Sequence, residues 1–242
     1  MHRITVQYDG TDYHGWQMQT GQRTIQGELT RALSLLNRAT VTIHGAGRTD
    51  AGVHALGQVA SFRIDVPFEP EDLMAAINGN LDPDIRVTEC SVVPESFHAR
   101  HSATSKSYRY RIWRRRVVSP FARRYVYHRS EALDLRAMRA AAALLPGTRD
   151  FSAFTVKDAE VQSKIRTLTR LDVEERDEEI WITAEADGFL RFMVRTIVGA
   201  LIEVGRGQMS PPELARVVEL GERENAGATA PAHGLTLMRV DY

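Results

Sequence analysis

The stretch Tyr108-Arg109-Tyr110-Arg111-Ile112-Trp113 has the clearest alternation in the sequence. Two tyrosines and an isoleucine take every second position, and arginines stand between them. Neighbouring side chains of a β-strand point to opposite faces, so the tyrosines share one face and the arginines the other. The pattern predicts a strand with one aromatic face and one basic face.

Helix and strand patterns alternate on both sides of this strand. Apolar residues three and four positions apart predict a helix from Ile25 to Leu36, with Thr24 as its N-cap. Further helices are expected at 69–78, 133–145, 191–204 and 211–220, and further strands at 3–8, 40–44, 56–64, 85–93, 165–173, 179–186 and 235–240. The order strand, helix, strands, helix, strand occurs twice, with the join near residues 95–105. We therefore expect a mixed α/β protein of two similar halves, residues 1–100 and 101–242, which share one sheet and have a cleft between them.

Composition limits the class of protein. The chain has 242 residues, of which 43% are hydrophobic and 26% charged, typical of a globular protein with a sizeable core. Its one cysteine, Cys90, forms no intrachain disulfide, which favours a reducing cytoplasm. We expect no secretory signal and no membrane span, because no apolar run reaches about 20 residues.

The charge is distributed unevenly, although the net charge is zero. Between His98 and Arg129 there are nine arginines and Lys106, with no Asp or Glu. The acidic residues are densest at residues 174–179. Such a distribution predicts a field that attracts a polyanion to one face of the molecule. The alternative interpretation is a solvated surface.

Three glycines surround Arg48, Thr49 and Asp50 in the segment GAGRTDAGVHA at residues 45–55. A phosphate-binding P-loop needs Lys and Ser or Thr after its last glycine, where Val53 and His54 stand. A dinucleotide loop needs a third glycine at the position of Asp50. Both nucleotide-loop interpretations fail, which leaves a tight turn with a structural aspartate, or a functional Asp50.

Residues 47–54, GRTDAGVH, resemble the signature of the tRNA pseudouridine synthase A family. Other segments resemble that family in the same order: YDGTDYHGWQ at 8–17, TIQGE at 24–28, FHAR at 97–100, KSYRY at 106–110, FMVRTIVG at 192–199 and GLTL at 234–237. Together they sample the chain from end to end. The resemblance implies two ferredoxin-like α/β halves that form one extended, antiparallel-rich sheet flanked by helices, with the active cleft between the halves.

The resemblance also implies the roles of individual residues. Asp50 is the expected catalytic carboxylate, Arg195 its ion-pair partner, and Tyr108 the residue that stacks on the target base and helps to remove its C5 proton. Arg48 is expected to help hold the target nucleotide out of its stack. Leu235 and Leu237 match an apolar wall near the base, although Thr236 stands where relatives often have an aromatic residue.

The implied reaction converts uridine to pseudouridine at positions 38, 39 and 40 of the tRNA anticodon stem-loop, without a metal or organic cofactor. Asp50 would attack C1′, stabilise positive charge there, or remove the C2′ proton, and the residues do not choose among these. Phosphate contacts are expected at Lys106, Arg109, Arg111 and Arg114. The family also implies a homodimer. The rivals are an RNA-binding module without catalysis, a glycoside or nucleoside hydrolase, and a synthase for another RNA.

Overall fold

The computed structural model describes residues 1–156 and 162–242, in two compact units. Unit 1 comprises Met1–Thr104 and Thr236–Tyr242, and unit 2 comprises Ser105–Leu235. The sequence predicted a division at residue 100 and assigned the C-terminal strand to the second half. In the structure, the chain's last seven residues group with the first unit.

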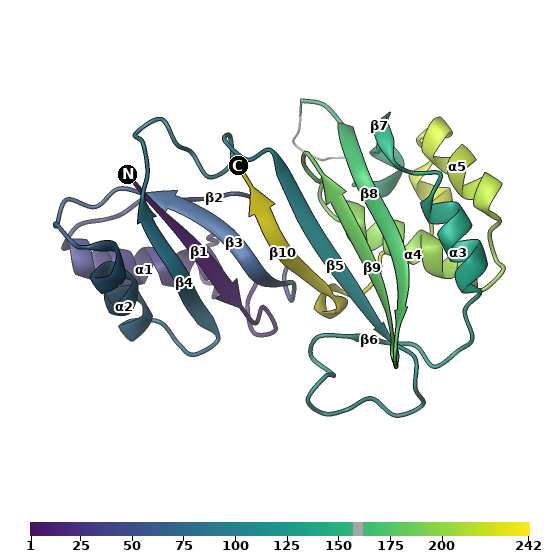
Figure 1. Cartoon of the computed structure of the whole chain (residues 1–242), viewed down its shortest axis with the longest axis horizontal. Helices are drawn as coiled ribbons and strands as arrows, with labels where there is room; N and C mark the ends of the chain where they lie inside the picture. The colour runs from purple at the N-terminus through teal and green to yellow at the C-terminus, as the bar shows by residue number, and fades with distance from the viewer. Residues whose placement is uncertain (157–161) are drawn as a thin grey trace. The chain divides into compact units, whose positions relative to one another are not determined.

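Unit 1 has the predicted order of strand, helix, strands, helix, strand (Figure 1). Its elements are β1 (His2–Tyr8), α1 (Ile25–Asn37), β2 (Ile43–Gly45), β3 (His54–Phe62), α2 (Pro70–Gly79) and β4 (Ile85–Val92). Strand β1 lies between β3 and β4 and is antiparallel to both, and β2 pairs with the other edge of β3. The C-terminal strand β10 (Leu235–Asp241) runs parallel to β3, with Thr236 opposite His54.

Helix α1 begins where its local sequence predicts. The Thr24 side chain accepts a hydrogen bond from the backbone N–H of Gly27, as an N-cap does. Ile25, Leu29 and Leu33 are fully buried on its inner face. The same inner core contains Ile4 and Phe62 from the strands and Leu73 and Ile77 from α2. Periodic apolar residues therefore build the layer that supports the sheet of unit 1.

Unit 2 contains the antiparallel strands β5 (Ser105–Trp113), β9 (Glu179–Ala186), β8 (Ile165–Arg176) and β7 (Gly147–Asp150), in that order. Its helices α3 (Leu135–Ala142), α4 (Met193–Gly205) and α5 (Pro211–Leu220) lie against one face of these strands (Figure 1). A short strand, β6 (Tyr127–His128), pairs in parallel with β5. The predicted mixed α/β class is confirmed.

The predicted alternation along β5 is confirmed as well. Tyr108, Tyr110 and Ile112 are buried, whereas Arg109 and Arg111 are partly exposed. Helix α4 is buried at most of its positions, because Val, Ile, Leu, Ala and Gly fill nearly every turn. The strand and the helix that carry Tyr108 and Arg195 are therefore firmly embedded in unit 2.

Several expected elements differ in extent. The helix predicted at 133–145 covers only Leu135–Ala142, because the Asp134 carboxylate caps it by accepting from the N–H groups of Arg136 and Ala137. The strand predicted at 40–44 is observed at Ile43–Gly45, and the strand predicted at 56–64 at His54–Phe62. The short strands β6 and β7 were not predicted.

Candidate active site

The Asp50 loop, residues 46–53, connects β2 to β3 in unit 1. At its start, the N–H of Ala46 donates to the carbonyl of Val59 at 2.8 Å. At its end, the N–H of Val53 donates to the Asp50 carbonyl at 3.1 Å, and Gly52 has φ +77°. The loop closes in a tight turn directly after Asp50, at a position where glycine is favoured.

A buried polar cluster holds the inner side of this loop. The Tyr8 hydroxyl lies 2.9 Å from Oγ1 of Thr49 and accepts a longer contact, 3.5 Å, from Nε2 of Gln58. The same Nε2 donates to the carbonyl of Gly47 at 2.9 Å. Burial raises the pKa of Tyr8 to about 12, although hydrogen bonds with Thr49 and Gln58 oppose the shift. Tyr8 therefore remains a neutral phenol at physiological pH.

The segment that follows β1, residues 9–23, braces the loop from another side. The N–H of Trp16 donates to the Thr49 carbonyl at 3.0 Å, and the N–H of Gly52 donates to the Tyr13 carbonyl at 3.3 Å. Gly15 has φ +85°, and a Cβ there would lie 2.5 Å from the carbonyl oxygen of Thr49. Only glycine permits this approach of the two backbones.

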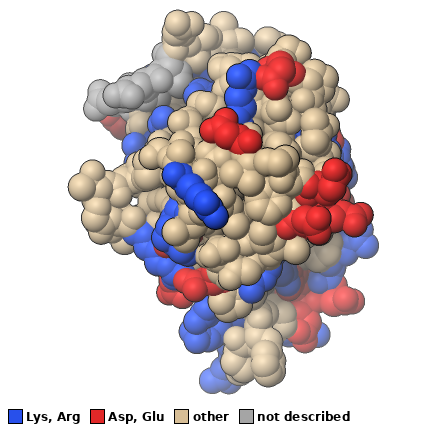
Figure 2. Space-filling view, turned by 90° about the vertical axis from the view of Figure 1, so that its left-hand side faces the viewer, with Lys and Arg blue, Asp and Glu red and all other residues tan. Residues whose placement is uncertain are grey.

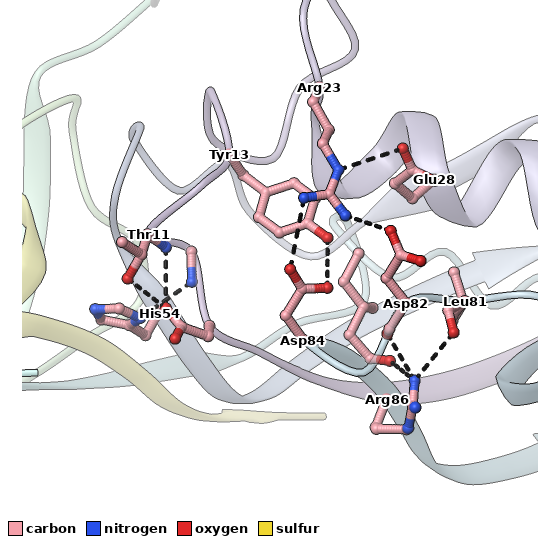
Figure 3. A network of polar contacts seen from close by, with 12 residues as sticks. Thr11, Tyr13, Arg23, Glu28, His54, Leu81, Asp82, Asp84 and Arg86 are labelled. Carbon is pink, nitrogen blue, oxygen red and sulfur yellow. Dashed lines mark hydrogen bonds and ion pairs between the residues drawn. The ribbon is translucent and has the colours of Figure 1, made fainter. Parts of the chain in front are cut away.

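An ion-pair network anchors the bracing segment to the rest of unit 1 (Figure 3). The Arg23 guanidinium pairs with Asp82, Asp84 and Glu28, and its Cζ lies 4.4 Å from the centroid of the Tyr13 ring. The Tyr13 hydroxyl donates to Asp84 at 2.7 Å. Burial and this bond to Asp84 raise the pKa of Tyr13 above its usual value. Two turns that are separate in sequence are thus tied together, and one of them contacts the Asp50 loop through the Tyr13 carbonyl.

His54, the first residue of β3, contacts the start of the same segment. Its Nδ1 accepts the N–H of Gly10 at 3.0 Å and lies 3.2 Å from the Asp9 carboxylate, which also accepts from Thr11 (Figure 3). A Cβ at Gly10 would lie 2.0 Å from the carbonyl oxygen of Val53. The histidine therefore fixes the exit of the Asp50 loop.

The predicted residues of the loop are accessible, in contrast to its buried support. Arg48 is exposed and Asp50 is half-buried, whereas Thr49 between them is buried. A rigid backbone thus presents a carboxylate and a guanidinium two residues apart. This arrangement provides the charged groups that the predicted chemistry needs.

Tyr108 and Arg195 lie in unit 2. Tyr108 is 6% exposed, and its ring packs edge-on against Phe189 with centroids 5.1 Å apart. Arg195 is in the first turn of α4, where its Nε donates to the carbonyl of Ala230 at 2.8 Å. Because Asp50 belongs to the other unit, the predicted pair of Asp50 with Arg195 stays a prediction.

The remaining predicted pocket residues are all well packed. Leu235 and Leu237 are buried, and Thr236 between them is partly exposed. Tyr110, which the alternation places on the same face as Tyr108, is fully buried, and its hydroxyl donates to the carbonyl of Pro231 at 2.8 Å. Tyr110 is therefore part of the core.

Strand β5 with the arginines that follow it and the acidic turn, residues 174–179, are close together in the structure. Arg111 forms two hydrogen bonds with Glu179, of 2.7 and 2.5 Å, and Arg114 and Arg115 pair with Glu175 and Glu178. The basic run and the acidic residues, which are separate in the sequence, are therefore in contact at these three arginines. On the face drawn in Figure 2, Lys and Arg side chains are likewise mixed with Asp and Glu side chains.

Glu179 is held as an anion by its neighbours. Burial alone would raise its pKa, but hydrogen bonds from Arg111 and from the Trp181 indole outweigh burial and hold the pKa below its usual value. Arg109 lies on the same face, with its guanidinium 4.2 Å from the centroid of the Trp181 ring. Lys106 is partly exposed nearer the start of β5.

Sequence reasoning missed the residues that support the loop. Tyr8, Trp16 and Gln58 received no role, although two of them lie in the segment 8–17 that resembles the family. Their side-chain contacts with Thr49 and Gly47 span 41 and 11 residues, so no local pattern could identify them. Gly15 was the nearest signal in the sequence that this segment approaches another backbone closely.

The described residues, 1–156 and 162–242, hold neither a cluster of metal ligands nor a membrane-spanning helix. No group of three or more His, Cys, Asp or Glu side chains in this part of the chain is arranged to hold a metal ion. Among the same residues, no helix is both long and apolar enough to cross a membrane.

Comparison with known proteins decides the family. A family model described as tRNA pseudouridine synthase matches residues 4–102 and 141–242. This chain belongs to the tRNA pseudouridine synthase family. The first matched segment contains the Asp50 loop, and the second contains Arg195.

Curated relatives of the family agree over nearly the whole chain. A tRNA pseudouridine synthase A of Anoxybacillus flavithermus is 44% identical over 241 residues, covering 99% of this chain and 98% of the relative. The protein of that name from Shouchella clausii is 44% identical over 238 residues and covers 98% and 91%. That of Bacillus subtilis is 41% identical over 242 residues and covers 99% and 98%. The family expected from the motifs is confirmed.

Proposed function

We propose that this protein isomerises uridine to pseudouridine in tRNA, with Asp50 as the catalytic carboxylate. The observation that carries the proposal is the position of Asp50 in a rigid, partly exposed loop, within a chain that matches the tRNA pseudouridine synthase family over almost its whole length. The buried cluster of Tyr8, Thr49 and Gln58 supports it, because a catalytic group is most effective when its loop is fixed before the substrate binds.

The reaction needs a carboxylate beside the ribose. The bond between N1 and C1′ breaks, the base turns, and a bond between C5 and C1′ forms. The C5 proton then leaves and N1 gains a proton, so that substrate and product are isomers. Asp50 would act as the nucleophile at C1′, as the counter-charge there, or as the base for the C2′ proton.

The other predicted residues would act around Asp50. Arg195 would pair with the carboxylate and keep it ionised, since a nearby positive charge lowers the pKa of an acid. Tyr108 would stack on the base and assist removal of the C5 proton. Arg48, which is exposed, would help to hold the flipped nucleotide. Leu235 and Leu237 would form the apolar wall of the base pocket.

The proposed substrate is the anticodon stem-loop at uridines 38, 39 and 40, and the proposed site of action is the cytoplasm. Recognition of neighbouring positions would depend on RNA shape and flexibility more than on base edges. Lys106, Arg109, Arg111 and Arg114 are proposed to contact phosphates, although Arg111 and Arg114 would have to share or exchange their carboxylate partners. We also propose that the protein acts as a homodimer.

The test is product analysis of an unmodified tRNA transcript treated with the protein. Nucleosides from the digested RNA are separated by chromatography, and the modified position is mapped by primer extension after carbodiimide treatment. Pseudouridine at positions 38–40 is the expected product. Pseudouridine elsewhere would assign another RNA site, free uracil would indicate a hydrolase, and binding without either product would indicate a binding module.

A further inference from the structure

A second set of RNA-compatible groups lies in the arginine loop, residues 114–126, which connects β5 to β6 in unit 2. It contains five arginines, Arg114, Arg115, Arg116, Arg123 and Arg124, and no acidic residue. The loop falls between the two segments that match the family model, residues 4–102 and 141–242. In Figure 1 it projects past the end of β5 and the hairpin between β8 and β9.

Specific hydrogen bonds shape the base of the arginine loop. The Trp113 indole N–H donates to the carbonyl of Val117 at 2.8 Å. Nε2 of His128 lies 2.8 Å from the carbonyl of Arg115. These bonds connect the first residues of the loop to both of the strands that it joins.

A turn at Ser119 shapes the tip. The Ser119 carbonyl accepts from the N–H groups of Ala122 and Arg123, and its hydroxyl accepts from the N–H of Phe121 at 3.3 Å. The turn leaves Phe121 91% exposed, and the neighbouring Val117 is 76% exposed. Phe121 has the highest exposure among the large apolar side chains of the described residues.

The loop keeps a positive charge in spite of its ion pairs. Arg114 and Arg115 pair with Glu175 and Glu178 of the acidic turn. Arg116 and Arg123 are exposed, and neither forms an ion pair within the described parts of the chain. Arg116 and Arg123 therefore stand on either side of the turn in the sequence, and their charges remain available to bind an anion.

An exposed aromatic ring between arginines fits a nucleic acid better than a second copy of this chain. Bases stack on aromatic side chains, while guanidinium groups bind the phosphates between them. A symmetric contact between two copies would place the arginines of one loop against those of the other, and the charges would repel. Phe121 and Val117 also offer far less apolar area than the roughly 800 Å² per partner of a stable interface.

We propose that the arginine loop binds the RNA substrate, with Phe121 stacking on an unpaired base and Arg116 and Arg123 contacting phosphates. The proposal rests on the proposed function, because it assumes that the substrate is a folded tRNA with unpaired bases. It adds a binding element to the residues around Asp50 and assigns no catalytic role to the loop.

The decisive experiment compares tRNA affinity among variants of Phe121. A stacked base typically contributes about 5-fold to 100-fold in affinity. We expect Phe121→Ala and Phe121→Leu to weaken binding of the unmodified transcript at least about 5-fold, while Phe121→Tyr stays close to the wild type. Val117→Ala is the matched control, an exposed apolar residue of the same loop without a ring. Its affinity should not change.

The arginines are tested by the salt dependence of binding. Arg116→Gln and Arg123→Gln should each reduce the slope of log affinity against log salt by roughly 0.7 to 0.9. Arg216→Gln, an exposed arginine on α5, serves as the control and should leave the slope unchanged.

Three outcomes would overturn the proposal. Phe121→Leu could bind as tightly as the wild type, which would exclude stacking. Phe121→Ala could alter the oligomeric state in size-exclusion chromatography with light scattering, which would assign the loop to a contact between copies. All the variants could bind normally while the wild type makes pseudouridine, which would refute the loop's role and leave the proposed function intact. If Phe121 proves necessary for binding but no pseudouridine forms, RNA binding by the loop stands and the proposed function fails.

Discussion

The hydroxyl of Tyr8 lies 2.9 Å from Oγ1 of Thr49, the residue directly before Asp50. The contact joins the end of β1 to the Asp50 loop across 41 residues of sequence. Both side chains are buried, so neither hydroxyl can replace its partner with bulk water. This pair therefore links the stability of unit 1 to the position of the proposed catalytic carboxylate.

The first prediction concerns Thr49. Thr49→Val keeps the shape of the side chain but removes the hydroxyl, so we expect the free energy of unfolding to fall by about 1 to 2 kcal/mol. The rate of pseudouridine formation should fall roughly 10-fold at saturating tRNA, because the loop loses its fixed position. Urea denaturation and single-turnover kinetics measure the two effects.

Thr49→Ser is the matched control because it retains Oγ. It should restore most of the rate and most of the stability. If the serine and valine variants react equally slowly, the hydroxyl pair does not position the loop.

The second prediction uses two glycines of the bracing segment. Gly15 and Gly21 both have positive φ, but a Cβ at Gly15 would lie 2.5 Å from the Thr49 carbonyl, whereas a Cβ at Gly21 would meet nothing within 4 Å. Both alanine variants should lose about 1 kcal/mol from the backbone conformation. Gly15→Ala should lose clearly more and should also slow the reaction, since Thr49 has to move.

Thermal unfolding and single-turnover rates of the two alanine variants provide the comparison. Equal losses of stability with equal rates would contradict the close approach at Gly15.

Local patterns predicted those parts of the fold whose cause is local. The alternation from Tyr108 to Ile112 and the Thr24 cap of α1 depend on neighbouring residues, and the structure confirms both. Strand β6 has only two residues and exists because Ile112 and Trp113 pair with it in parallel. Nothing in its own sequence could reveal that partner.

The candidate site, too, was predicted only where the signal is local in the sequence. Asp50 was identified by a contiguous motif, and the comparisons confirm the family that the motif indicated. The partners of its loop were not identified, because the pairing of β1 with β3 in the sheet brings Tyr8 and Gln58 to it. The bond between Arg111 and Glu179 spans 68 residues and brings together two charge runs that look separate in the sequence.

The third prediction concerns the Arg111–Glu179 pair. Removing one partner of this partly buried ion pair leaves an uncompensated charge, so Arg111→Ala and Glu179→Ala should each lower the free energy of unfolding by about 1 to 2 kcal/mol. A double-mutant cycle measured by urea denaturation should give a coupling energy of about 1 to 3 kcal/mol.

The exposed pair Arg170–Asp172 is the control for this cycle, and its coupling energy should be below about 1 kcal/mol. Equal coupling energies for the two pairs would show that the partial burial of Arg111 and Glu179 adds nothing to their interaction. In that case Arg111 would be available to contact a phosphate instead.

The fourth prediction concerns pH and the histidine cluster of unit 1. The His98 ring lies 4.8 Å from that of His44 and 4.4 Å from that of His101, centroid to centroid. Burial lowers the pKa of His98, and the nearby His101, His44 and Arg100 lower it further. Between this lowered value and about 6.5, the unfolded chain binds more protons than the folded chain, so stability falls as the pH falls through this window.

Urea midpoints at pH 7.5 and 5.5 test the effect. His98→Asn should reduce the loss of stability at low pH, because Asn does not titrate, while its side-chain oxygen can replace Nδ1 as the acceptor for the backbone N–H of Arg100. The loss should not disappear, since burial also lowers the pKa of His2 and His233. His14→Asn changes an exposed histidine, and its urea midpoint should shift between the two pH values as much as that of the wild type. If the midpoint of His98→Asn also shifts as much as that of the wild type, the assignment to His98 is refuted.

The central claim is that Asp50 performs the chemistry, and release of tritium from C5 of uridine tests it most directly. An unmodified tRNA transcript tritiated at C5 is incubated under single-turnover conditions with the wild type, Asp50→Asn and Asp65→Asn, an exposed carboxylate that serves as the control. We predict that the wild type and Asp65→Asn release tritium to water, and that Asp50→Asn binds the tRNA but releases none. Release by Asp50→Asn at the wild-type rate would contradict the account.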